Sequence, residues 1–144
     1  MSQLDKINTK ILELLEEDGR KSFTEIADRL KMNESTVRKR VLALQRNGVI
    51  KRFTIAVDPS KLGINTVAIV GIDVEPTRLL EISQKLCDFK EIRCVATSSG
   101  DHMILTEIWT KDGRELTRLI SEKIKNLEGV KRICPAIVLE KLKG

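Results

Sequence analysis

The sequence has few aromatic residues and no long apolar run. It contains no tyrosine, one tryptophan and three phenylalanines among 144 residues, so it lacks the row of rings on which single-stranded nucleic acid stacks. The longest uncharged apolar run, Val67 to Ile72, is far shorter than the roughly 20 residues that cross a bilayer. The start, Met1 to Lys6, is polar and has no signal-peptide core. These absences predict a soluble, cytoplasmic protein without a membrane partner.

Cysteine and histidine are also scarce. The three cysteines, Cys87, Cys94 and Cys134, form no C-x-x-C pair, and we expect them to be small core residues in a reducing compartment. His102 is the single histidine, and no phosphate-cradling Gly-rich loop accompanies it. Neither a nucleophile with its base nor a metal-binding set can be assembled from these residues. The sequence therefore assigns no catalytic residue, metal or cofactor, and predicts that the protein is not an enzyme.

Positive charge is in excess, and the excess is concentrated near the start of the chain. The formal net charge is +5. Residues 1–57 carry 12 Lys and Arg against 8 Asp and Glu, whereas residues 58–144 carry 14 against 13. A local cationic excess permits a polyanionic partner, which we expect to bind the first 57 residues.

Three helices are predicted in this first third. Residues 5–17 have apolar positions at helical spacing after a capping aspartate. A second helix begins at Ser22, which forms a capping box with Glu25. A third, over residues 33–47, has Asn33 as its cap and ends at Gly48, a residue suited to the left-handed position after a helix. The short connection between the second and third helices favours a helix-turn-helix.

The third helix is the candidate DNA reader. Val37, Val41 and Leu44 share one face and must point to the core, so that Ser35, Lys39 and Arg46 point away. Hydroxyls at the helix start followed by cations suit a major groove, where the first turns meet base edges and cations reach phosphates. A charge run can also be merely a solvated face. The candidate DNA-binding residues are the hydroxyl and cationic residues of this helix and the next segment: Ser35, Thr36, Arg38, Lys39, Arg40, Arg46, Lys51 and Arg52.

The remainder predicts a second domain. Val49 to Val57 is rich in β-formers and reads as a strand that leaves the first unit, and Asp58-Pro59 then breaks it. We therefore expect a DNA-binding domain with its linker strand over 1–57 and an effector-binding and oligomerisation domain over 58–144. Beyond the boundary, strands and helices follow in the order βαββαβ, over Thr66–Val74, Pro76–Leu86, Ile92–Ser98, His102–Thr110, Asp112–Asn126 and Val130–Leu142.

This order predicts an α+β protein in which a winged helix-turn-helix precedes a ferredoxin-like sandwich. Both helices of such a sandwich cover one face of a four-stranded sheet. Residues 67–72 are apolar on both faces of the first strand, so we expect a second chain to cover the open face and form at least a homodimer. Pro135 costs a ladder hydrogen bond and predicts an edge strand.

With both halves in view, the chain resembles the Lrp/AsnC family, the leucine-responsive or feast/famine regulators of bacteria and archaea. Its motifs are Leu4-Asp5 to Leu15, Ser35 to Val41, Asn47 to Phe53, Asp58-Pro59 with Leu62-Gly63, and Ser99-Gly100-Asp101. The resemblance implies dimers, often assembled into octamers, that bind imperfectly palindromic sites on double-stranded DNA. It also implies a response to an amino acid or related metabolite at clefts between dimers.

Carried over by position, the effector cleft involves Thr97, Ser98, Ser99, Gly100, Asp101 and His102. The family's turn commonly reads glycine, any residue, aromatic, aspartate, whereas this chain has a histidine and then Met103. An α-amino group thereby loses an acidic partner, and an altered ligand, or none, stays open. A tight hairpin turn explains Gly100-Asp101 without any ligand, and His102 can be a plain strand-end residue.

Together these features predict a sequence-specific DNA-binding transcription regulator that oligomerises and senses a metabolite. One alternative is an architectural protein that binds any duplex through its cations. A minor alternative is a tetrapyrrole-acting enzyme of the same architecture, in which only His102 could serve.

Overall fold

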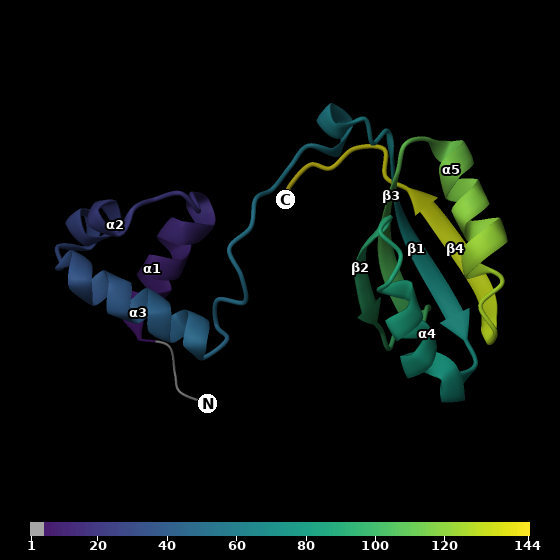
Figure 1. The fold of residues 1–144 in the computed structure, drawn as a ribbon, viewed down its shortest axis with the longest axis horizontal. Helices are drawn as coiled ribbons and strands as arrows, with labels where there is room; N and C mark the ends of the chain where they lie inside the picture. Colours follow the sequence, from purple (N-terminus) through teal and green to yellow (C-terminus); the bar gives the residue numbers. More distant parts are fainter. Residues whose placement is uncertain (1–4) are drawn as a thin grey trace. The chain divides into compact units, whose positions relative to one another are not determined.

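The structure, a computed structural model, describes residues 5–144 and divides the chain into two compact units, Met1–Val57 and Asp58–Gly144 (Figure 1). Leu4, which opens the first motif of the family resemblance, lies outside the described residues. In the described part, no helix has both the length and the apolar character needed to cross a membrane.

Three helices make up the first unit: α1 (Lys6–Glu17), α2 (Phe23–Leu30) and α3 (Glu34–Arg46). The predicted caps of the first two are present. Asp5 accepts the amide N–H of Asn8 at 2.7 Å, and both hydrogen bonds of the Ser22–Glu25 capping box form. Asn33 stands at the start of α3 but makes no side-chain cap bond, so that part of the prediction is wrong. The three helices pack around a small apolar core that contains Ile11, Ile26, Ala27, Val37 and Val41.

The backbone changes direction on both sides of α3. Lys31 adopts a left-handed conformation, with φ 55°, immediately after α2. A non-glycine residue there is uncommon and marks a tight turn. This turn allows α3 to begin a few residues after α2 without a long loop, as the helix-turn-helix requires. Gly48 follows α3 with φ 74°, the left-handed conformation that we expected at this position.

The linker over residues 49–57 is not a strand, contrary to our prediction. Ile50 donates its amide N–H to the carbonyl of Leu44 at 3.0 Å, and the residues after it are exposed. A β-strand needs a neighbouring strand to accept and donate its backbone hydrogen bonds. Within residues 5–144 no segment supplies one, so the β-formers of the linker do not make a wing here.

The second unit is a four-stranded antiparallel sheet with helices on one face, which confirms the ferredoxin-like prediction (Figure 1). The strands lie side by side in the order β2-β3-β1-β4. Its elements are the 3₁₀ turn η1 (Pro59–Leu62), β1 (Thr66–Val74), the 3₁₀ turn η2 (Pro76–Arg78), α4 (Leu79–Leu86), β2 (Ile92–Thr97), β3 (Ile104–Thr110), α5 (Gly113–Arg118), its wider π-helical continuation η3 (Leu119–Ile124), and β4 (Val130–Ile137).

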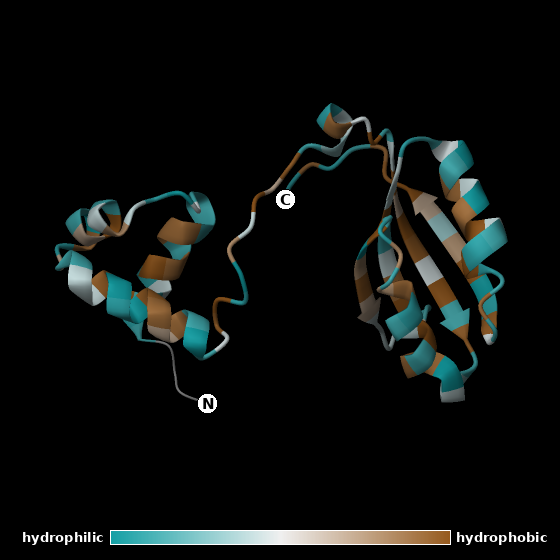
Figure 2. Cartoon of the chain, in the orientation of Figure 1, coloured by the Kyte–Doolittle hydropathy of each residue, from teal (hydrophilic) through white to brown (hydrophobic). Residues whose placement is uncertain are grey.

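The two faces of the sheet have different surroundings. Ala68, Val70, Ile72 and Val74 of β1 are buried in the core that the sheet forms with α4, α5 and η3. Alternate residues point to the other face, where Ile69 keeps 42% and Leu105 keeps 39% of their surface exposed. Apolar colour accordingly runs along much of the strands in Figure 2. The first strand is therefore apolar on both faces, as its sequence indicated, but this chain covers only one of them.

Several strand boundaries differ from the expected ones. The predicted third strand begins at Ile104 rather than His102, and the second ends at Thr97, because Ser98 donates its amide N–H to the carbonyl of Met103 at 2.9 Å and closes a turn. The last strand ends at Ile137 rather than Leu142. Pro135 lies on the edge strand β4, as predicted.

The cysteines are not core residues, so that prediction is wrong. Cys87 and Cys94 are exposed and Cys134 is half-buried. The register places Cys94 opposite Glu107, and Cys134 opposite Gly71. Both thiols therefore belong to the sheet face that lies away from the helices.

Candidate DNA-binding helix and effector turn

The outward stripe of α3 is the candidate DNA-binding surface. Ser35, Lys39 and Arg46 are exposed, and neither cation forms an ion pair within the described residues. Leu42 is 50% exposed. Helical spacing places it on the same stripe, between Lys39 and Arg46. The stripe therefore combines a hydroxyl, two free cations and one apolar side chain.

Arg40 belongs to the contact between two helices more than to this stripe. Its Nη1 donates to Asp5 Oδ2 at 2.7 Å and to Asn8 Oδ1 at 3.1 Å, and its side chain is 29% exposed. The hydrogen bond from the Asn8 amide, and then the one from Arg40, hold the pKa of Asp5 below its ordinary value. Arg40 thus ties α3 to the start of α1, a contact that the sequence did not reveal.

Arg38 is also engaged within the unit. It pairs with Glu34, one turn earlier on the same helix. Its guanidinium carbon lies 5.4 Å from the centre of the Phe23 ring, within the range of a cation–π contact. Both contacts are exposed and weak, since surface ion pairs of this kind contribute about 0–1 kcal/mol. Arg38 could exchange them for a phosphate.

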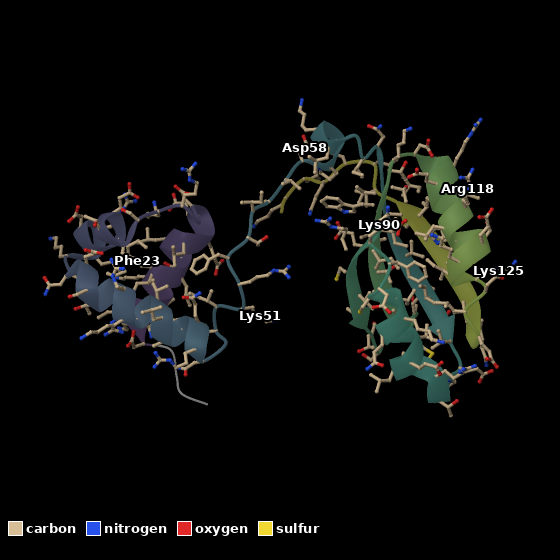
Figure 3. The ribbon with its side chains drawn as sticks, in the orientation of Figure 1. Phe23, Lys51, Asp58, Lys90, Arg118 and Lys125 are labelled. Atoms are coloured by element: carbon tan, nitrogen blue, oxygen red, sulfur yellow. The ribbon has the colours of Figure 1, made fainter. Side chains whose placement is uncertain are left out.

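The remaining predicted DNA-binding residues flank α3. Thr36 is half-buried in its first turn, and Lys51 and Arg52 are exposed on the linker that follows it. Figure 3 labels Lys51, whose side chain projects from the linker. The structure therefore brings Ser35, Lys39 and Arg46 onto one stripe, and leaves the linker cations on a separate, extended segment.

The predicted effector residues lie at the end of β2 and in the turn that leads to β3. Thr97, Ser99, Gly100 and Asp101 are exposed, and Ser98 and His102 are half-buried. The Ser98 hydroxyl accepts the Gly100 amide N–H at 3.0 Å, which shapes the turn. The six residues are consecutive in the sequence, and the structure places them together at one end of the β2–β3 hairpin.

Asp73 of β1 contacts this turn, and the sequence did not predict this contact. Its Oδ1 accepts the Met103 amide N–H at 3.2 Å, and its Oδ2 lies 3.3 Å from His102 Nδ1. Asp73 is the single charged residue in the apolar strand β1. That position was the available signal, because a carboxylate in a largely buried strand needs partners. The neighbouring strand β1 thus places a carboxylate beside the end of the turn.

Gly71 makes room for His102. A Cβ at residue 71 would lie 2.3 Å from Cδ2 of the imidazole, which is much closer than atoms can approach. The ring therefore lies directly against the backbone of β1 on the face away from the helices. Any larger residue at position 71 would push His102 off this face.

Comparison with known proteins decides the family. The model of the AsnC-type helix-turn-helix domain matches residues 4–48, and that of the Lrp/AsnC ligand binding domain matches residues 67–144. The chain belongs to the Lrp/AsnC family. The family predicted from the sequence is thereby confirmed.

Relatives in this family match almost the whole chain. It is 48% identical over 140 residues to the HTH-type transcriptional regulator LrpA of Pyrococcus horikoshii, covering 97% of this chain and 99% of that protein. LrpA of Pyrococcus abyssi is 48% identical over 143 residues, with 99% of each chain covered.

Solved structures of the family share the fold. Escherichia coli AsnC has a TM-score of 0.89 at 22% identity, covering 99% of this chain and 96% of that one. A transcriptional regulator from Neisseria meningitidis in complex with L-methionine has a TM-score of 0.91 at 19% identity, covering 99% and 94%. At these identities the likeness concerns the fold.

Proposed function

We propose that this Lrp/AsnC chain is a sequence-specific, double-stranded-DNA-binding transcription regulator whose C-terminal unit oligomerises and senses an amino acid or related metabolite. The observation that carries the proposal is the stripe on α3, where Ser35, Lys39 and Arg46 are exposed and the opposite side of the helix is buried. The relatives named LrpA are HTH-type transcriptional regulators, which supports the same function for this chain.

The stripe has the chemistry of a major-groove reader. A hydroxyl near the helix start can donate to or accept from base edges, and cations further along can reach phosphates. Leu42 adds an apolar group suited to the methyl of thymine. Arg38 adds a cation beside the stripe, and Lys51 and Arg52 add cations on the separate linker segment that follows α3. Arg40 contributes mainly by fixing the angle between α3 and α1.

A second copy of the chain is the proposed cover for the exposed sheet face. Ile69 of β1 and Leu105 of β3 lie diagonally on this face, since the register pairs Ile69 with Glu107 and Leu105 with Gly71, and both expose apolar surface there. Sheets stacked face to face would remove that surface from water. A dimer of this kind would carry two α3 helices. An imperfect palindrome whose half-sites lie one helical turn of DNA apart, about 34 Å, would match them. Octamers could follow from further contacts between dimers.

The turn from Thr97 to His102, together with Asp73, is the proposed effector site. An α-ammonium group needs an acidic partner, and Asp73 or Asp101 could supply one. The neisserial relative holds L-methionine, so this amino acid is the first probe. Titration calorimetry should detect L-methionine or a related amino acid with the unaltered chain and a weaker response with Asp73→Asn. If Asp73→Asn bound every tested amino acid as tightly as the unaltered chain does, the proposal would be contradicted.

The DNA-binding proposal is tested by two classes of variant on one selected duplex and one scrambled duplex. Ser35→Ala and Thr36→Ala should reduce the preference for the selected duplex, because they remove groups that can contact bases. Lys51→Ala and Arg52→Ala should weaken binding to both duplexes, and each should lower the salt slope by about 0.9 per lost phosphate contact. If the unaltered chain bound both duplexes equally, the architectural alternative would replace the regulator.

A further inference from the structure

A cysteine and the single histidine are neighbours on the sheet face that lies away from the helices. The register pairs Cys134 of β4 with Gly71 of β1. The Cβ positions of such a pair point to the same face and lie about 4.5–5.5 Å apart. The His102 ring occupies the place of the missing Cβ, since a Cβ at residue 71 would lie 2.3 Å from its Cδ2. The imidazole therefore lies about one cross-strand spacing from the Cys134 side chain.

A carboxylate orients this histidine. Asp73 Oδ2 lies 3.3 Å from His102 Nδ1, and both side chains are 23% exposed. When Nδ1 carries the proton, it donates to Asp73, and Nε2 keeps its lone pair. Histidines that bind metals have this arrangement, because a carboxylate at one ring nitrogen fixes the tautomer and directs the other nitrogen to the ion. His102 Nε2 is thus the nitrogen available to a ligand.

One chain supplies two such ligands, which is half of a tetrahedral site. Thiolate sulfur and imidazole nitrogen are ligands that Zn²⁺ prefers, and structural zinc sites have four of them. Within residues 5–144, no cluster of three or more His, Cys, Asp or Glu side chains is suited to a metal ion. Cys134 and His102 therefore form an incomplete site, whose remaining ligands must come from another molecule.

The position of the pair in the sheet brings it close to its own copy in the proposed dimer. β1 is an inner strand in the order β2-β3-β1-β4, and Gly71 lies near the middle of its nine residues. A two-fold dimer uses the same surface on both copies, so residues near the centre of the stacked faces meet their own counterparts. Ile69 and Leu105 lie beside Gly71 along β1 and across on β3, and these apolar side chains would exclude water from the centre.

We propose that the dimer binds one Zn²⁺ at the centre of its interface, through Cys134 and His102 of each copy. This inference rests on the proposed stacking of two sheets and adds a metal ion to it. Two chains would supply a tetrahedral Cys₂His₂ set, with Asp73 behind each histidine. The ion would hold the sheets together and would fix His102 beside the effector turn. Sequence spacing did not reveal the pair, because Cys134 and His102 meet only across β1.

Zinc stoichiometry and oligomeric state are measured on the same full chain, stripped of metal with EDTA and kept reduced. Titration against a chromogenic zinc indicator should show one Zn²⁺ bound per two chains. Co²⁺ in its place should give the absorption of a tetrahedral thiolate complex. Sedimentation should show that the dimer persists to about tenfold lower protein concentration with Zn²⁺ than with EDTA, because the ion binds the assembled form.

The two measurements separate this inference from the proposed dimer. A dimer that binds no zinc would overturn the metal site and leave the stacked sheets intact. A monomer in both conditions would overturn both. Binding of one Zn²⁺ per chain, or a cobalt spectrum without thiolate absorption, would also overturn the site, and neither reading depends on a variant that folds.

Matched thiol variants locate the ligands. Cys134→Ser should weaken zinc binding more than about a hundredfold, because each dimer loses two ligands, and Asp73→Asn should weaken it about tenfold to a hundredfold, as a lost outer-shell partner does. Cys94→Ser removes the other thiol of the same face, on the far edge strand β2, and should change the affinity less than about twofold. Equal weakening by the two serine variants would overturn the site.

Discussion

The helical unit and the sheet unit use their apolar residues differently. In the helical unit, Ile11, Ile26 and Val37 are fully buried among three helices, and the outward side of α3 is largely polar. In the sheet unit, Ile72 is fully buried, yet Ile69 on the same strand is 42% exposed. The three helices of the first unit thus bury one another's apolar side chains, and they leave a charged surface that can bind a polyanion. The sheet is covered on one face within this chain, and in our proposal a second copy covers the other face.

The contrast between Ile72 and Ile69 gives the largest expected effect. Ile72→Ala should lower the free energy of unfolding by about 2–5 kcal/mol at any protein concentration, because it leaves a cavity in the core. Ile69→Ala should have a small effect on the monomer, but should shift the oligomer towards monomer as the protein is diluted. Denaturant unfolding at several concentrations, with sedimentation, measures both. An Ile69→Ala effect that does not vary with concentration would remove the argument for a dimer through this face.

Gly71 tests how closely the effector turn depends on the sheet. In Gly71→Ala the new methyl would displace the His102 ring, and we expect a loss of about 1–3 kcal/mol, typical of overpacking. The His102 resonances should shift, while those of α1 to α3 should not. Gly113→Ala is the matched control, because a Cβ there meets no atom within 4 Å. Unchanged His102 resonances in Gly71→Ala would show that the ring does not lie where the structure places it.

Two adjacent cations of α3 should behave oppositely if the helical unit separates packing from DNA contact. Arg40→Ala should lower stability by up to about 1 kcal/mol, since it removes the hydrogen bonds to Asp5 and Asn8. Lys39→Ala should leave stability unchanged and weaken duplex binding with a lower salt slope. Thermal denaturation and binding at several salt concentrations give both readings. Equal loss of DNA binding without loss of stability in the two variants would assign Arg40 to the DNA surface instead.

The smallest expected effect is the pH dependence of the α1–α3 contact. The pKa of Asp5 is lowered below its ordinary value of 3.8 by the Asn8 amide and by Arg40. A lowered pKa means that the carboxylate stabilises the folded state above the ordinary value, and that this contribution is lost as the pH falls through the folded-state value. Asp5→Asn should therefore flatten the acid limb of stability below about pH 4. An identical acid limb in both proteins would contradict this contact.

Local signals in the sequence predicted much of the fold. The Ser22–Glu25 box marked the start of α2, and the apolar run from Val67 to Ile72 lies within a strand with the expected bounds of Thr66–Val74. Such features depend on residues a few positions apart. The prediction of a strand in the linker was wrong for the opposite reason. Residues that favour β-structure become a strand only when another segment pairs with them.

The candidate sites likewise contain some residues that local patterns predict and others whose contacts arise only from packing. Helical periodicity was enough to predict that Ser35, Lys39 and Arg46 share an exposed stripe. The contact of Arg40 with Asp5 spans 35 residues, and that of His102 with Asp73 spans 29. Both arise from how helices or strands pack, so no short motif could show them. Spacing alone thus assigned Arg40 to the DNA surface and omitted Asp73 from the effector turn.

The most direct test of the regulator proposal is selection of duplexes from a random library by the purified full chain at near-physiological salt. It requires neither a guessed promoter nor a guessed effector. The account predicts recovery of one imperfect palindrome whose half-sites lie about one helical turn apart. Strong retention of random sequence, without any shared motif, would contradict sequence-specific reading by α3 and would favour an architectural DNA-binding protein.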